Sequence, residues 1–151
     1  MEKIGIFKAS EILNKPKYSD FEETILLGIH WFANSLSQKE IENQFLSLMI
    51  ILEVFLTPGG TEPITKSISE SIARILLAGL NKRKALKDDV KKLYKKRSAI
   101  VHGRKKDMPS AEDVSQLRAI ASDLILWMIE KSDRFENKDE LLDYIEDRSL
   151  A

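Results

Sequence analysis

Arg97 and His102 are the two residues of this chain whose types and spacing are best suited to chemistry. Arg97 shares a helical face, at alternating spacings of four and three residues, with the apolar residues Leu86, Val90, Leu93 and Ile100. An arginine at such a position points inward, where a charge is costly unless a partner or a wet cleft accepts it. His102 follows five residues later, directly before a glycine that predicts the end of the helix. Together they predict a phosphate-binding site.

Both residues also have structural interpretations, which stay open. An internal ion pair explains Arg97 as well, and Glu53 is the expected partner because it is the only charged residue of the apolar segment 45–56. Such a pair is also compatible with a functional arginine that it orients. His102 is favourable at a helix end simply because the negative end of the helix dipole attracts a cation.

Tyr94 and Ser98 lie near Arg97 in the same predicted helix and are expected to support the site. A serine hydroxyl within a helix bonds to its own backbone more often than to a ligand. Tyr94, one turn before Ser98, is expected to pack against the core. His30, between two apolar residues of an earlier helix, is expected at the edge of the core.

The segment 82–106 is strongly basic, although the whole chain has no net charge. It carries twelve lysines and arginines against two aspartates, a local charge of +10, so the other residues carry −10. A basic strip attracts a polyanion, whereas a run of charge without a site is usually a solvated helix face. The cations nearest to Arg97 and His102 are the predicted contacts to an RNA backbone: Lys95, Lys96, Arg104, Lys105 and Lys106.

The composition indicates a single cytoplasmic domain. A chain of 151 residues is long enough to bury one core, and its lack of cysteine is typical of a reducing compartment. Residues 1–18 have no signal-peptide pattern, and the apolar segment 45–56 is shorter than the about 20 residues of a membrane span. No set of residues has the spacing of metal ligands, so we expect no metal and no other cofactor.

Helix signals recur along the chain, and strand signals do not. Capping boxes at Ser19 and Ser37, each followed three residues later by glutamate, predict the first two helices, and Ser110 and Asn137 predict later helix starts. Ala33 and Ile64 are expected on inner helical faces. The predicted helices cover residues 20–36, 37–56, 63–80, 84–102, 110–128 and 137–145. Short loops between them predict an all-α antiparallel bundle of four to five main helices plus a short C-terminal helix.

Residues 93–103, Leu-Tyr-Lys-Lys-Arg-Ser-Ala-Ile-Val-His-Gly, resemble the Arg-x4-6-His signature of HEPN domains in the form seen in the Apea-like branch. The similarity extends over about residues 21–131, with Trp31 in the first helix, Leu52 and Glu53 near the end of the second, and Arg74 in the third. It places a HEPN-like helical domain at 19–132, between an N-terminal extension (1–18) and a short C-terminal helix (133–151).

The resemblance implies a bundle that pairs about a two-fold axis and brings two Arg/His motifs into one cleft. Many active HEPN members are metal-independent endoribonucleases of toxin, phage-defence and RNA-processing systems. The implied partners are therefore RNA, a second copy of the chain, and an antitoxin or defence-system protein, with no membrane. Some HEPN toxins carry a modified tyrosine two residues beyond the histidine, but this chain has Arg104 there, so that form of control is not expected.

Metal-independent RNA cleavage needs a base for the 2′-hydroxyl, an acid for the leaving 5′-oxygen, and positive charge at the transition state. One histidine does not easily serve as both, so two copies of His102 are expected to share these roles across a homodimer. Two Arg97 guanidiniums would stabilise the phosphate oxygens. The alternative is a catalytically silent HEPN module for RNA binding or dimerisation, as part of a longer protein.

Overall fold

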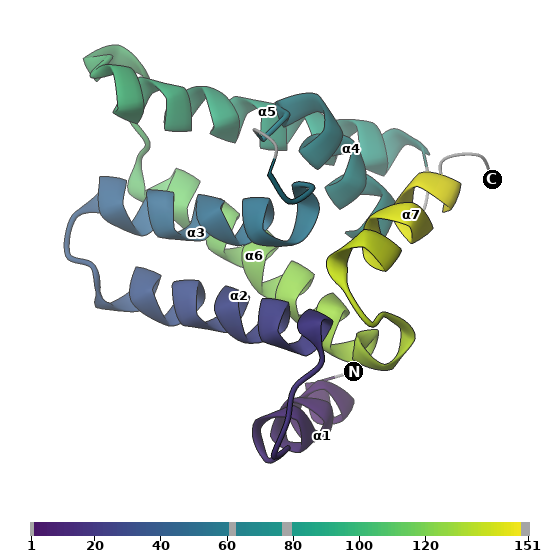
Figure 1. Ribbon diagram of the computed structural model, residues 1–151. Coiled ribbons are helices and arrows are strands. Elements are labelled where there is room, and N and C mark those ends of the chain that lie inside the picture. The colour runs from purple at the N-terminus through teal and green to yellow at the C-terminus, as the bar shows by residue number, and fades with distance from the viewer. Residues whose placement is uncertain (1, 61–62, 77–79, 149–151) are drawn as a thin grey trace.

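The computed structural model describes residues 2–60, 63–76 and 80–148, and this part of the chain is all-helical with no strand. The all-α bundle predicted from the sequence is thereby confirmed (Figure 1). The α-helices are α1 (Glu2–Leu13), α2 (Asp20–Ser37), α3 (Ile41–Leu56), α4 (Thr65–Leu76), α5 (Leu80–His102), α6 (Ala111–Glu130) and α7 (Lys138–Arg148). Two short 3-10 helices, η1 (Lys105–Asp107) and η2 (Ser132–Arg134), flank α6. None of the described helices is long and apolar enough to cross a membrane.

Three of the four predicted helix starts are confirmed by their side-chain hydrogen bonds. Ser19 and Ser110 each accept a bond from the backbone three residues later, in reciprocal capping boxes with Glu22 and Asp113. The Asn137 side chain accepts a bond from the Glu140 backbone at 3.0 Å and so caps α7. A polar side chain that satisfies a free N–H is a local signal, which is why the sequence reveals it.

The predicted capping box at Ser37 is wrong. Ser37 is the last residue of α2, and its hydroxyl donates to the backbone oxygen of Asn34 at 2.9 Å. The next helix begins at Ile41, after Glu40, whose side chain makes no capping bond. Ser37 is therefore already used by the helix before it, and α3 starts four residues later than predicted.

The boundary between the third and fourth predicted helices also differs. The sequence pattern predicts helices over 63–80 and 84–102, whereas α4 spans Thr65–Leu76 and α5 begins at Leu80. Residues 77–79 of this prediction lie outside the described residues. Ile64 precedes the first turn of α4, so helical periodicity does not apply to it, and its side chain is exposed instead of inward. Ala33 is exposed as well, because the buried positions of α2 include Phe21, Ile25, Gly28 and Ser35.

The apolar helix α3 lies at the centre of the bundle and contacts four other helices. It packs against α2 on one side, against α6 behind it, and against α4 and α5 on the opposite side from α2 (Figure 1). Its large side chains, Phe45, Leu48, Met49, Leu52 and Phe55, are fully buried. The pair α4 and α5 is in extensive mutual contact, and α5, which carries Arg97 and His102, also contacts α3.

The N-terminal segment forms a helix that the sequence patterns do not predict. α1 packs against α6, with Ile12 buried, while Ile6 and Phe7 face solvent. Lys8 ties it to the end of α6, because its ammonium donates to the backbone oxygen of Glu130 at 2.9 Å and pairs with Asp133 at 3.1 Å. Its apolar residues follow no clear single face, so periodicity alone does not reveal the helix.

A buried carboxylate at the start of α2 bonds to the segment that connects α1 and α2. Glu22 accepts bonds from the Lys15 ammonium at 2.7 Å and from the Ser19 backbone at 3.0 Å. Burial raises the pKa of the Glu22 carboxyl, but the bonds from Lys15 and Ser19 outweigh it, so that the pKa lies below its ordinary value. The ionised form of Glu22 therefore stabilises the fold.

We expect Glu22→Gln to lower the free energy of unfolding by about 1 kcal/mol near pH 7. Because the folded pKa is depressed, the wild-type advantage is complete above the ordinary carboxyl pKa. It is lost as the pH falls through the lower folded pKa. Urea unfolding at several pH values measures this difference, and Glu23→Gln, an exposed neighbour, is the control. A destabilisation that does not change down to acid pH would contradict the assignment.

Candidate functional site

The end of α5 presents His102 to solvent through a glycine-dependent helix stop. Gly103 has φ of +67°, a left-handed conformation that favours glycine. The backbone N–H of Arg104 donates to the oxygen of Ala99 at 2.9 Å, and that of Gly103 to Ile100 at 3.3 Å, which is the Schellman pattern. The predicted stop is confirmed, and it leaves His102 exposed on the last turn.

Arg97 forms the ion pair that the sequence suggested. Its Nε atom lies 2.9 Å from Oε1 of Glu53, which α3 contributes from the core side. The Glu53 side chain is 15% exposed and the Arg97 side chain 35% exposed. Arg97 is therefore only partly inward: one edge of its guanidinium is held by α3, and the rest of the side chain reaches the surface. The pair orients the group without sealing it from a ligand.

Arg97 and His102 line one hollow of about 190 Å³, which we call the Arg–His hollow. α5 contributes Tyr94, Arg97, Ser98, Val101 and His102, and the segment at the start of α4 contributes Pro63 and Thr65. The hollow is smaller than the pockets that hold whole nucleotides, but its polar lining with an arginine and a histidine suits a single phosphate group. The sequence patterns do not point to Pro63, Thr65 or Val101, because no local signal marks which loop packs beside α5.

Tyr94 forms the buried back of the Arg–His hollow. The residue is 8% exposed, and its hydroxyl makes no hydrogen bond with any described residue. Burial raises the pKa of the Tyr94 hydroxyl and the nearby Glu53 carboxylate raises it further, while Arg97 acts in the opposite direction. The hydroxyl stays protonated at neutral pH and cannot act as a base. Tyr94 is thus a packing residue, as predicted, which helps to seat Arg97.

Ser98 has a different partner from the one expected. Its hydroxyl oxygen accepts a hydrogen bond from the guanidinium Nη2 of Arg104 at 2.9 Å, a residue that lies beyond the helix end. The return of the chain after Gly103 brings Arg104 back alongside α5. This contact fixes a second arginine next to the Arg–His hollow.

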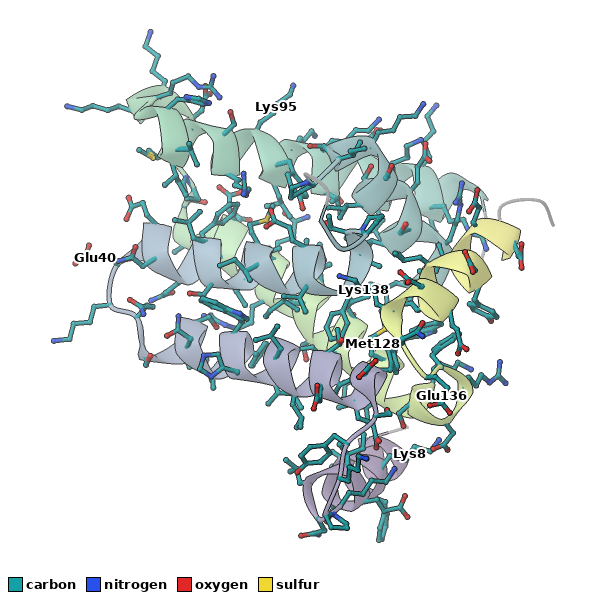
Figure 2. All side chains as sticks on the ribbon, viewed as in Figure 1. Lys8, Glu40, Lys95, Met128, Glu136 and Lys138 are labelled. Atoms are coloured by element: carbon teal, nitrogen blue, oxygen red, sulfur yellow. The ribbon has the colours of Figure 1, made fainter. Side chains whose placement is uncertain are left out.

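The lysines predicted to contact RNA lie on the outer surface of α5, beside the start of α6, and on η1. Lys95 extends outward from α5 (Figure 2), and Lys96 lies 3.9 Å from Asp113 at the start of α6. Lys105 and Lys106 are exposed on η1. Of the predicted site residues, the structure brings Tyr94, Arg97, Ser98 and His102 together, with Glu53 paired to Arg97. None of the predicted lysines lines this hollow.

Among the described residues, no group of three or more histidine, cysteine, aspartate or glutamate side chains is arranged to hold a metal ion. Comparison with protein-family models, with curated protein sequences and with solved structures finds no match. The functional assignment therefore rests on the geometry of the site and on the sequence motif that it contains.

Proposed function

We propose that this protein is a metal-independent endoribonuclease of the HEPN type, which cleaves RNA at a site shared by two copies of the chain. The observation that carries the proposal is the Arg–His hollow, where Arg97 and His102 reach the same small polar space. Glu53 supports the proposal because it holds one edge of the guanidinium at 2.9 Å and leaves the side chain partly exposed. A role as a toxin or phage-defence effector rests on the resemblance of residues 93–103 alone.

The proposed reaction is an internal transesterification. One His102 takes the proton of the 2′-hydroxyl, the 2′-oxygen attacks phosphorus, and the P–O5′ bond breaks. The second His102, protonated, gives its proton to the leaving 5′-oxygen. The products are a 2′,3′-cyclic phosphate and a 5′-hydroxyl. The Arg97 guanidiniums stabilise the charge that builds on the phosphate oxygens in the transition state.

Exposed apolar side chains beside the hollow support a second copy of the chain. Val101, which lines the hollow, is 63% exposed, and Ile64, between two lining residues, is 60% exposed. Covering such side chains on both sides of a two-fold axis gives a self-complementary contact next to both histidines. A stable dimer of this kind is expected to bury about 1,200–2,000 Å² in total.

The decisive experiment is a mixing assay in the presence of a chelator. Wild-type protein and His102→Ala are unfolded together in equal amounts and refolded, and cleavage of a labelled RNA is measured. If a site needs two histidines, only wild-type homodimers cleave, and the activity per total protein falls to about one quarter of the wild-type value. Independent sites would give about one half. The product ends and the sedimentation coefficient are measured in parallel, and cleavage by a monomer would contradict the composite site.

The second candidate function is a silent HEPN module that binds RNA or dimerises. The specific observation in its favour is the same ion pair, since Glu53 neutralises Arg97 at the place where a phosphate would bind. Binding of RNA without cleavage, over many substrates and conditions, is the result that would select this candidate.

A further inference from the structure

A second and larger hollow, of about 600 Å³, lies between α5, η1 and the start of α6. We call it the α5–α6 groove. Leu93 and Lys96 of α5 face it, whereas Arg97 and Val101 face the Arg–His hollow, so the two spaces lie on different faces of α5. The polar side chains that line the groove include Asp89, Lys92, Lys95, Arg104, Asp107 and Gln116.

The groove presents charges of both signs that are not used within the fold. Lys92, Lys95, Asp89 and Asp107 form no ion pair with another described residue, although all four line the same space. Lys96 and Asp113 are 3.9 Å apart at its edge. Because the other lysines and aspartates of the groove are not paired with each other, a bound molecule can accept hydrogen bonds from the lysines and donate hydrogen bonds to the aspartates.

These charges do not suit a track for phosphates. Three carboxylates, Asp89, Asp107 and Asp113, line the groove together with the cations. A carboxylate repels a phosphate as strongly as a lysine at the same distance attracts it. A neutral nucleobase avoids this conflict, because its edge offers N–H donors to the carboxylates and oxygen or nitrogen acceptors to the cations. The volume of the groove also falls in the range of about 300–1,000 Å³ that is typical of small-molecule and cofactor sites.

Among the four RNA bases, guanine fits this lining best. It alone places two adjacent donors, N1–H and N2–H, on one edge, where they match the two oxygens of a single carboxylate. Its O6 and N7 atoms accept from lysine or arginine, the commonest specific contact to that base. Asp107 is the carboxylate we assign, since it lies in one turn with Arg104, to whose backbone oxygen its N–H donates at 3.2 Å.

Arg104 connects the groove to the proposed reaction site. It lines the groove, and its guanidinium donates to Ser98, which lines the Arg–His hollow. Arg104 and Ser98 thus link the two spaces at the end of α5, so an RNA strand with a phosphate beside Arg97 would need to pass Arg104 to place a neighbouring base in the groove. We infer that the α5–α6 groove binds a guanine base next to the cleaved bond. This inference rests on the proposed function, because it assumes an RNA substrate.

The test measures binding rather than cleavage, so that the two proposals fail separately. The probes are fluorescent 2′-O-methyl hexanucleotides of uridine with one internal guanine, inosine, adenine or cytosine, which cannot be cut. We expect the wild-type full chain to bind the guanine probe about tenfold tighter than the adenine probe. Inosine, which lacks the N2 amino group, is expected to lie between them.

Asp107→Asn is expected to remove most of this preference while leaving binding of the cytosine probe within about twofold. Asp88→Asn, an exposed aspartate of α5 outside the groove, is the matched control and should keep the preference. Circular dichroism verifies that both variants fold.

Equal affinity for all four probes, or a preference that survives Asp107→Asn, would overturn the inference and leave the ribonuclease proposal intact. A guanine preference without any cleavage of ordinary RNA would support guanine binding at the groove and contradict the ribonuclease proposal. Failure to bind any of the hexanucleotides would also overturn the inference, while cleavage of ordinary RNA, measured separately, decides the ribonuclease proposal.

Discussion

His102→Ala is expected to lower the rate of RNA cleavage by a factor of about 10² to 10⁴. In the proposed reaction this residue supplies both the base and the acid, one from each copy of the chain, so the substitution removes both proton transfers at once. The imidazole is exposed on the last turn of α5 and makes no hydrogen bond with a described residue that the fold would lose. Stability should therefore change little, and single-turnover cleavage in a chelator measures the effect directly.

The chain offers a matched control for this variant. His30, the only other histidine, is exposed on α2 and lies outside the Arg–His hollow. His30→Ala should cleave RNA at the wild-type rate. Equal cleavage by wild type and His102→Ala would show that the activity does not use this histidine and would remove the proposed mechanism.

Arg97→Lys is expected to lower the cleavage rate at saturating RNA by about 10²-fold, with a much smaller change in RNA affinity. Lysine keeps the positive charge but loses the planar fork, which can bind Glu53 on one edge and a phosphate on the other. A point charge cannot hold both partners in fixed directions. The loss should therefore appear in the rate at saturation and not in binding.

A contrasting variant separates charge that positions RNA from charge that acts in the reaction. Lys105→Ala combined with Lys106→Ala removes two exposed cations of η1 that lie outside the hollow. It should weaken RNA binding and reduce the slope of log affinity against log salt by up to about two. Turnover at saturating RNA should stay near the wild-type value. Wild-type cleavage by Arg97→Lys, or loss of turnover with unchanged affinity in the double variant, would contradict the division of roles.

Local sequence patterns predict many of the helices of this fold. Caps at Ser19, Ser110 and Asn137 and the apolar spacing of α3 and α6 act over three or four residues, so the sequence alone determines these elements. Local pattern is misleading at Ser37, where a serine that fits a cap is bonded into the preceding helix. It also does not reveal α1, whose helix is held by contacts to α6 more than 100 residues away.

Some features of the candidate site are also predicted from the sequence, and others depend on the tertiary structure. The partly inward position of Arg97 and the stop after His102 are predicted from the sequence. Glu53 is the expected partner because a lone charge in an apolar segment needs a partner of opposite sign. Only the tertiary structure decided that the start of α4 closes the Arg–His hollow and that Arg104 reaches Ser98. It also decided that Lys92, Lys95 and Lys96 of α5 line a groove between α5 and α6. Those contacts join elements distant in the chain and depend on how helices pack, which no local spacing encodes.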